Sequence, residues 1–67
     1  MANESKKVFN DLMENYVGLG ESANTKVRQL RKISSPDSRR KIINELRNLE
    51  NKRLELLDMA DELTKST

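Results

Sequence analysis

The stretch Ser34-Ser35-Pro36-Asp37-Ser38 divides this 67-residue chain near its middle. Pro36 disfavours helical backbone geometry at Ser35, and proline is well suited to the first position of a new helix. Ser35 is then the N-cap of that helix, and Asp37 is favourable in its first turn. The stretch therefore predicts a tight turn over residues 34–37, with a helix that begins at about residue 36.

The residues before this turn carry apolar side chains at alternating intervals of three and four, which is the spacing of one helix face. A strand would need alternation by two, and the stretch 10–15 does not alternate. The pattern predicts a helix from about residue 4 to residue 33. Its stripe consists of Phe9, Met13, Tyr16, Gly20, Ala23, Val27 and Leu30, flanked by Val8, Leu12, Leu19 and Ile33.

The residues after the turn repeat this spacing and predict a second helix over about 36–64. Its stripe consists of Ile42, Leu46, Leu49, Leu56, Ala60 and Leu63, with Ile43 and Leu57 widening it on one side. Arg53 interrupts the stripe, and its methylene stem is expected to lie along apolar surface while its guanidinium reaches water. Leu54 falls off the stripe and is expected to be exposed. Because so short a connection makes the helices antiparallel neighbours, the predicted fold class is all-α, a single antiparallel helical hairpin domain.

Two glycines in Gly18-Leu19-Gly20 weaken the first predicted helix, since each costs on the order of 1 kcal/mol relative to alanine. The apolar repeat nevertheless runs through Gly20 without a change of phase. Gly20 and Ala23 also form a small patch that large side chains are expected to enter, and Leu46 and Leu49 are predicted to lie roughly opposite. We therefore expect a continuous or merely kinked helix, and the alternative is three helices with a break between Val17 and Glu21.

The size and composition of the chain point to a partner. A chain of 67 residues builds only a marginal core, and this one has no cysteine and no histidine to add a disulfide or a structural zinc site. Each predicted helix is apolar over more than a narrow seam, so a single neighbour would leave part of it uncovered. We expect a second hairpin or a helical protein partner to cover the remainder, most simply as a homodimeric, coiled-coil-like four-helix bundle.

Several functions are not expected from this sequence. Catalysis needs a titratable group held in a pocket beside a partner, whereas two helices enclose no pocket, so no enzymatic activity is predicted. The stretch Gly18-x-Gly20-x-x-Ala23 matches a dinucleotide fingerprint in form, but no strand precedes it, and no cofactor is predicted. No apolar run exceeds two or three residues, so neither a membrane span nor a signal peptide is expected, and the predicted location is the cytoplasm.

Charge is unevenly distributed along the chain. Residues 1–25 and residues 42–67 each carry a net charge of −2, whereas residues 26–41 carry +6. Cations in the last turns of the first helix complement its dipole, but cations in the opening turns of the second do not. The candidate contacts for an anionic partner are Lys26, Arg28, Arg31, Lys32, Arg39, Arg40 and Lys41.

Residues 26–41 form the turn end of the predicted hairpin, which we call the basic tip, and two functions follow from it. The first is a small regulatory or scaffolding module that binds protein, including an antiparallel second copy whose acidic open end meets the tip. The alternative is a regulator that binds RNA or DNA phosphates through the tip, although no aromatic side chain lies there to stack on bases. The expected helix interface consists of Phe9, Leu12, Met13, Tyr16, Ala23, Val27, Leu30, Ile42, Leu46, Leu49, Leu56, Leu57, Ala60 and Leu63.

In architecture the predicted hairpin resembles the short helical hairpins that dimerise into four-helix bundles, among them the plasmid RNA-regulating Rop protein and small secretion co-chaperones. The resemblance lies in the helical pattern and involves no shared residues. It therefore implies a mode of assembly and assigns no site.

Overall fold

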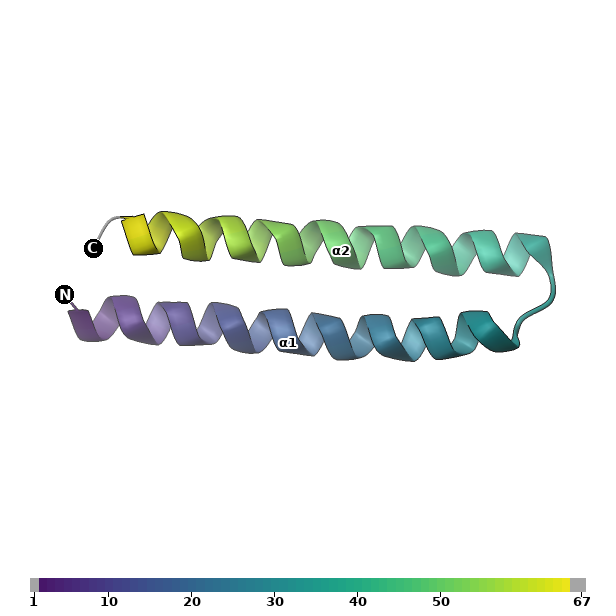
Figure 1. The fold of residues 1–67 in the computed structure, drawn as a ribbon, viewed down its shortest axis with the longest axis horizontal. Coiled ribbons are helices and arrows are strands. Elements are labelled where there is room, and N and C mark those ends of the chain that lie inside the picture. Colours follow the sequence, from purple (N-terminus) through teal and green to yellow (C-terminus); the bar gives the residue numbers. More distant parts are fainter. Residues whose placement is uncertain (1, 66–67) are drawn as a thin grey trace.

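The structure is a computed structural model that describes residues 2–65, apart from the side chains at positions 2, 3 and 5. It consists of two helices, α1 (Ala2–Lys32) and α2 (Pro36–Lys65), joined by residues 33–35. The helices run side by side in opposite directions, so residues 2 and 65 lie at the same end of the molecule (Figure 1). No strand occurs within residues 2–65. The predicted all-α antiparallel hairpin is therefore confirmed.

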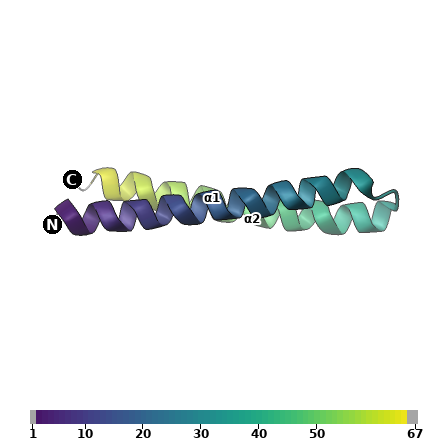
Figure 2. The same cartoon turned by 90° about the horizontal axis from the view of Figure 1, so that it is seen from below.

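α1 is continuous through the two glycines. Neither Gly18 nor Gly20 has a positive φ angle, and both lie within an uninterrupted helical segment. Figure 2 shows α1 passing over α2 at a shallow angle without a sharp bend. The alternative of three helices with a break near Val17 is therefore wrong, because packing along the seam outweighs the low helix propensity of glycine.

The connection between the helices is held by backbone hydrogen bonds at both ends. The Ile33 amide donates to the Leu30 carbonyl at 3.3 Å, which closes the end of α1 with a tight turn. The Arg39 amide donates to the Ser35 carbonyl at 3.0 Å, which is the first hydrogen bond of α2. Pro36 is the first residue of α2, as expected, and the connection spans residues 33–35, whereas the turn was expected over 34–37.

The hairpin is thin, with extents of 51 × 15 × 10 Å. Among the described side chains only those of Ala23, Ile42 and Ala60 are buried. Most other apolar side chains of the seam are half-buried: Leu12, Met13, Tyr16, Leu19 and Leu30 from α1, Ile33 from the connection, and Leu46, Leu49, Leu56 and Leu63 from α2. The two helices thus share a single layer of side chains. Because this layer is open to water on both sides of the hairpin, few of its side chains are fully buried.

Candidate interaction surfaces

The residues expected at the helix interface divide into two groups in this hairpin. Eleven of them are buried or half-buried: Leu12, Met13, Tyr16, Ala23, Leu30, Ile42, Leu46, Leu49, Leu56, Ala60 and Leu63. Phe9, Val27 and Leu57 are exposed. Leu54, which was expected to fall off the stripe, is 58% exposed. The first group therefore holds the hairpin together, while the second borders it.

Arg53 occupies the seam between the helices. Its guanidinium carbon lies 4.1 Å from the centroid of the Tyr16 ring, which is a cation–π geometry. Its Nη1 lies 3.4 Å from the carboxylate of Glu50 on the same helix, and the side chain is only 24% exposed. Its Nε is buried without a hydrogen-bond partner in the described part of the chain. The apolar pattern did not predict that the guanidinium also packs on the Tyr16 ring, a contact that the ring and the small surface of α1 at Gly20 allow.

Gly20 provides the space for this arrangement. A methyl group at Gly20 would lie 2.9 Å from Arg53 Nη2 and 3.3 Å from the guanidinium carbon, whereas a methyl group at Gly18 would meet nothing within 4 Å. Leu46 and Leu49 were expected opposite the small patch, but Arg53 is the side chain that contacts Gly20. Tyr16 and Arg53 are about equally many residues from the turn, so counting outward along both helices predicts that they lie at the same level. The apolar pattern alone does not predict this pairing.

Lys26 and Glu45 link the two helices nearer the turn. The Lys26 ammonium donates a hydrogen bond to the Glu45 carboxylate in an ion pair between α1 and α2. This hydrogen bond is the main cause of a lowered pKa at Glu45, with burial opposing it and the charges of Lys26 and Lys41 adding to it. Lys26, expected among the contacts for an anionic partner, thus serves as a tie within the hairpin.

Arg39 also has a structural role at the turn. Its Nε donates to the Ile33 carbonyl at 2.8 Å, so its cation satisfies a carbonyl at the carboxyl end of α1. This contact accounts for a positive charge in the opening turn of α2, where the dipole alone would disfavour it. The remaining cations of the basic tip are exposed and form no ion pair within residues 2–65: Arg28, Arg31, Lys32, Arg40 and Lys41.

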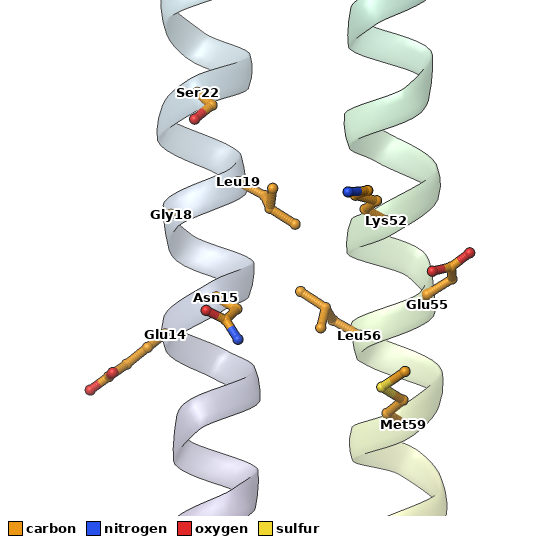
Figure 3. A pocket seen from close by; sticks show the side chains of 9 residues that line it. All are labelled: Glu14, Asn15, Gly18, Leu19, Ser22, Lys52, Glu55, Leu56 and Met59. Atoms are coloured by element: carbon orange, nitrogen blue, oxygen red, sulfur yellow. The ribbon is translucent and has the colours of Figure 1, made fainter.

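One long face of the hairpin contains a shallow, mixed groove. Leu19 and Leu56 project toward each other across it, and Lys52 and Met59 lie on its α2 side (Figure 3). Its other lining residues are Glu14, Asn15, Gly18, Ser22 and Glu55. Toward the turn the same face continues past Leu19 to the ion pair of Lys26 and Glu45. Polar and charged groups therefore line most of this groove face.

The opposite face is more apolar. Helical periodicity places Val17 and Val27 on the side of α1 away from Leu19, and Ile43 and Leu57 on the side of α2 away from Lys52 and Met59. The exposed fractions of these four side chains are 57%, 41%, 38% and 40%. Half-buried Met13 shares this side with Val17 in a shallow depression. We call the surface formed by Val17, Val27, Ile43 and Leu57 the apolar face.

Neither helix within residues 2–65 is long and apolar enough to cross a membrane. The described residues also contain no cluster of three or more acidic side chains arranged to hold a metal ion. The fold and surfaces thus define the chain structurally as an all-α helical hairpin with two unequal faces. No protein-family model, curated protein or solved structure matches this chain.

Proposed function

We propose that this chain is a small, non-enzymatic regulatory or scaffolding module that acts by packing its helices against another helical surface, in the first instance a second copy of itself. The observation that carries the proposal is the imbalance between core and surface. Only three described side chains are buried, while large apolar side chains on both helices are at least 36% exposed. A lone hairpin of this size lacks the buried area that ordinarily stabilises a folded chain.

The arrangement of the exposed side chains favours a helical partner. Val17 and Val27 lie on α1 and Ile43 and Leu57 on α2, so a partner that covers them must contact both helices over their middle turns. A second hairpin offers two helices of the same length and completes a four-helix bundle. Assembly as a homodimer therefore covers the surface without requiring a different protein.

Analytical ultracentrifugation combined with thermal melting tests this proposal. Sedimentation equilibrium is expected to show a dimer at micromolar concentration, and the helical signal in far-UV circular dichroism is expected to melt at a temperature that rises with protein concentration. A folded monomer with a concentration-independent melt would contradict self-association. A monomer with a random-coil spectrum would point instead to an obligate partner of another kind.

The exposed cations of the basic tip favour a second candidate function, the binding of RNA or DNA. Five of them lack an intramolecular ion pair within the described residues, so they are available to phosphates. Retention on heparin or bulk nucleic acid across a salt gradient distinguishes the two functions. Binding that persists near physiological salt would favour the nucleic-acid function, and elution at low salt would favour the protein module.

A further inference from the structure

The two long faces of the hairpin differ in what they offer a second copy. The groove face presents Lys52 and Glu55 beside its leucines, together with the ion pair of Lys26 and Glu45. The apolar face presents exposed aliphatic side chains on both helices. Covering the groove face would remove several charges from water, whereas covering the apolar face would remove aliphatic surface on both helices together with the ion pair of Glu50 and Arg53.

We infer that a second copy docks on the apolar face, related to the first by a twofold axis that lies in that face and crosses the hairpin at mid-length. This inference rests on the proposed self-association and specifies its face and orientation. In this arrangement α1 packs on α1 of the second copy and α2 on α2, each pair antiparallel, with the two basic tips at opposite ends.

The positions of the exposed apolar side chains fit such an axis. Phe9 and Val27 stand nine residues on either side of Gly18, and Val17 lies next to that midpoint. A transverse twofold axis at Gly18 therefore brings Phe9 of one copy to the level of Val27 of the other, and each Val17 close to its counterpart.

The same symmetry holds on α2. Ile43 and Leu57 stand seven residues on either side of Glu50, so the axis brings each to the level of the other residue in the second copy. Glu50 itself lies near the axis, where two carboxylates approach. Each has the guanidinium of Arg53 at 3.4 Å in its own chain, which offsets the like charges.

Charge disfavours the other twofold arrangement on this face. An axis along the hairpin would pack α1 on α2 of the second copy and keep the two tips together. It would set the cations at Arg28, Arg31 and Lys32 against those at Arg39, Arg40 and Lys41. Such juxtaposed like charges oppose association.

The transverse axis gives the opposite result on α2. The opening turns of α2, with Arg39, Arg40 and Lys41, then lie beside the closing turns of the other copy. Those turns carry four carboxylates, at Glu55, Asp58, Asp61 and Glu62. Apolar burial stabilises the association, and charge selects its orientation, since each exposed ion pair contributes only about 0–1 kcal/mol.

Single cysteines test the face and the orientation together, and the chain has no cysteine of its own. Val17→Cys lies on the apolar face near the axis, and Asn15→Cys is its matched control at nearly the same level on the groove face. Ser38→Cys marks the tip. Each variant is oxidised in solution and examined for disulfide-linked dimers, and Ser38→Cys is also spin-labelled for a distance measurement.

Val17→Cys is expected to form the disulfide dimer readily, because the two residues approach within disulfide range near the axis. Asn15→Cys and Ser38→Cys are expected to remain unlinked, with the tip labels on the order of 36 Å apart, since each Ser38 lies twelve residues from the axis at Glu50 and the helix rises 1.5 Å per residue. Dimers that link through Asn15→Cys would overturn the assignment of the face. Dimers that link through Ser38→Cys would overturn the orientation.

A pair of charge substitutions keeps the test independent of disulfide geometry. Leu57→Glu is expected to weaken dimerisation on the order of 100-fold, because it places a carboxylate in the apolar interface. Met59→Glu, on the groove face, is expected to change it less than about threefold, although Met59 is the more exposed of the two residues. The reverse order would overturn the inference. Unsubstituted protein that sediments as a monomer at every concentration would instead contradict self-association itself.

Discussion

Arg53 shows how one residue changes the character of an otherwise aliphatic seam. Its guanidinium lies over the Tyr16 ring and against Gly20, in a space that a larger residue on α1 would fill. The cation–π contact contributes about 0.5–2 kcal/mol, whereas a buried Nε without a partner costs about 1–3 kcal/mol. The two effects are of similar size, so we expect Arg53 to specify the register of the helices more than to stabilise them.

Substitution of the two glycines separates helix propensity from packing. Gly18→Ala is expected to raise the free energy of unfolding by about 0.5–1 kcal/mol, because the new methyl group meets open space and alanine favours helix. Gly20→Ala is expected to gain less, because its methyl group displaces the guanidinium of Arg53. Chemical denaturation measures both changes.

The control for this pair is Gly20→Ala in a protein whose residue 53 has no guanidinium. In an Arg53→Met background, Gly20→Ala is expected to recover the gain seen for Gly18→Ala. If Gly20→Ala stabilises the unmodified protein as much as Gly18→Ala does, the contact between Gly20 and Arg53 has no energetic consequence.

At the level of the helices, the hairpin is held by a half-buried leucine seam and by two polar ties near the turn. The ties are the ion pair of Lys26 with Glu45 and the hydrogen bond from Arg39 to the Ile33 carbonyl. Both lie in the half of the molecule that contains the turn. The seam runs further, to Leu12 and Leu63 near the open end.

Leucine substitutions on α2 test the helical phase. Leu49→Ala is expected to lower the free energy of unfolding by about 1–3 kcal/mol, since its side chain is half-buried in the seam. Leu54→Ala is its matched control on the same helix and is expected to cost less than Leu49→Ala, since its side chain is 58% exposed in the hairpin. If a urea titration shows equal losses of unfolding free energy for the two variants, the helical phase assigned to α2 is wrong.

The pH dependence of stability reports on Glu45. Its pKa is lowered from 4.5 chiefly by the hydrogen bond from Lys26, so its contribution is present above pH 4.5 and is lost as the pH falls through the lowered pKa. Glu45→Gln is therefore expected to melt below the unmodified protein near pH 7, with the difference narrowing on acidification. A difference that is constant from pH 7 to pH 3 would show that this pair does not stabilise the fold. Lys26→Met serves as the reciprocal control.

At the scale of the whole molecule, the asymmetry of charge sets the orientation that we propose for two copies of this chain. Both ends of the hairpin carry exposed charge, with cations around the turn and carboxylates in the last turns of α2. The proposed dimer pairs the two ends. Its orientation is then sensitive to salt, while its apolar contacts are not.

A charge exchange tests the proposed pairing of ends. Arg40→Glu is expected to weaken dimerisation about 3- to 10-fold at low salt, because it sets like charges together on the two copies of α2. Adding Asp61→Lys is expected to restore much of the loss. Arg40 is the better choice over Arg39, whose side chain caps α1. Both variants are expected to keep the helical circular dichroism signal of the unmodified protein. A loss that Asp61→Lys does not reverse would contradict the antiparallel pairing.

The turn and the helical character of both halves of this protein follow from local features of the sequence. The proline within Ser34-Ser35-Pro36-Asp37-Ser38 allows a helix to begin and disfavours one that continues, and the apolar spacing on either side admits only helix. These signals act over a few residues, so they require no knowledge of tertiary contacts. For the same reason the exposure of Leu54 followed from periodicity alone.

The contacts of the polar side chains, in contrast, depend on how the two helices pack. The apolar pattern placed only the stem of Arg53 on apolar surface and made Lys26 a candidate contact for a partner, whereas the packed hairpin also sets the guanidinium of Arg53 on Tyr16 and pairs Lys26 with Glu45. These contacts join residues far apart in the sequence, so they depend on the relative level and rotation of the two helices. A one-dimensional pattern gives the face of each helix but does not fix which side chains meet across the seam.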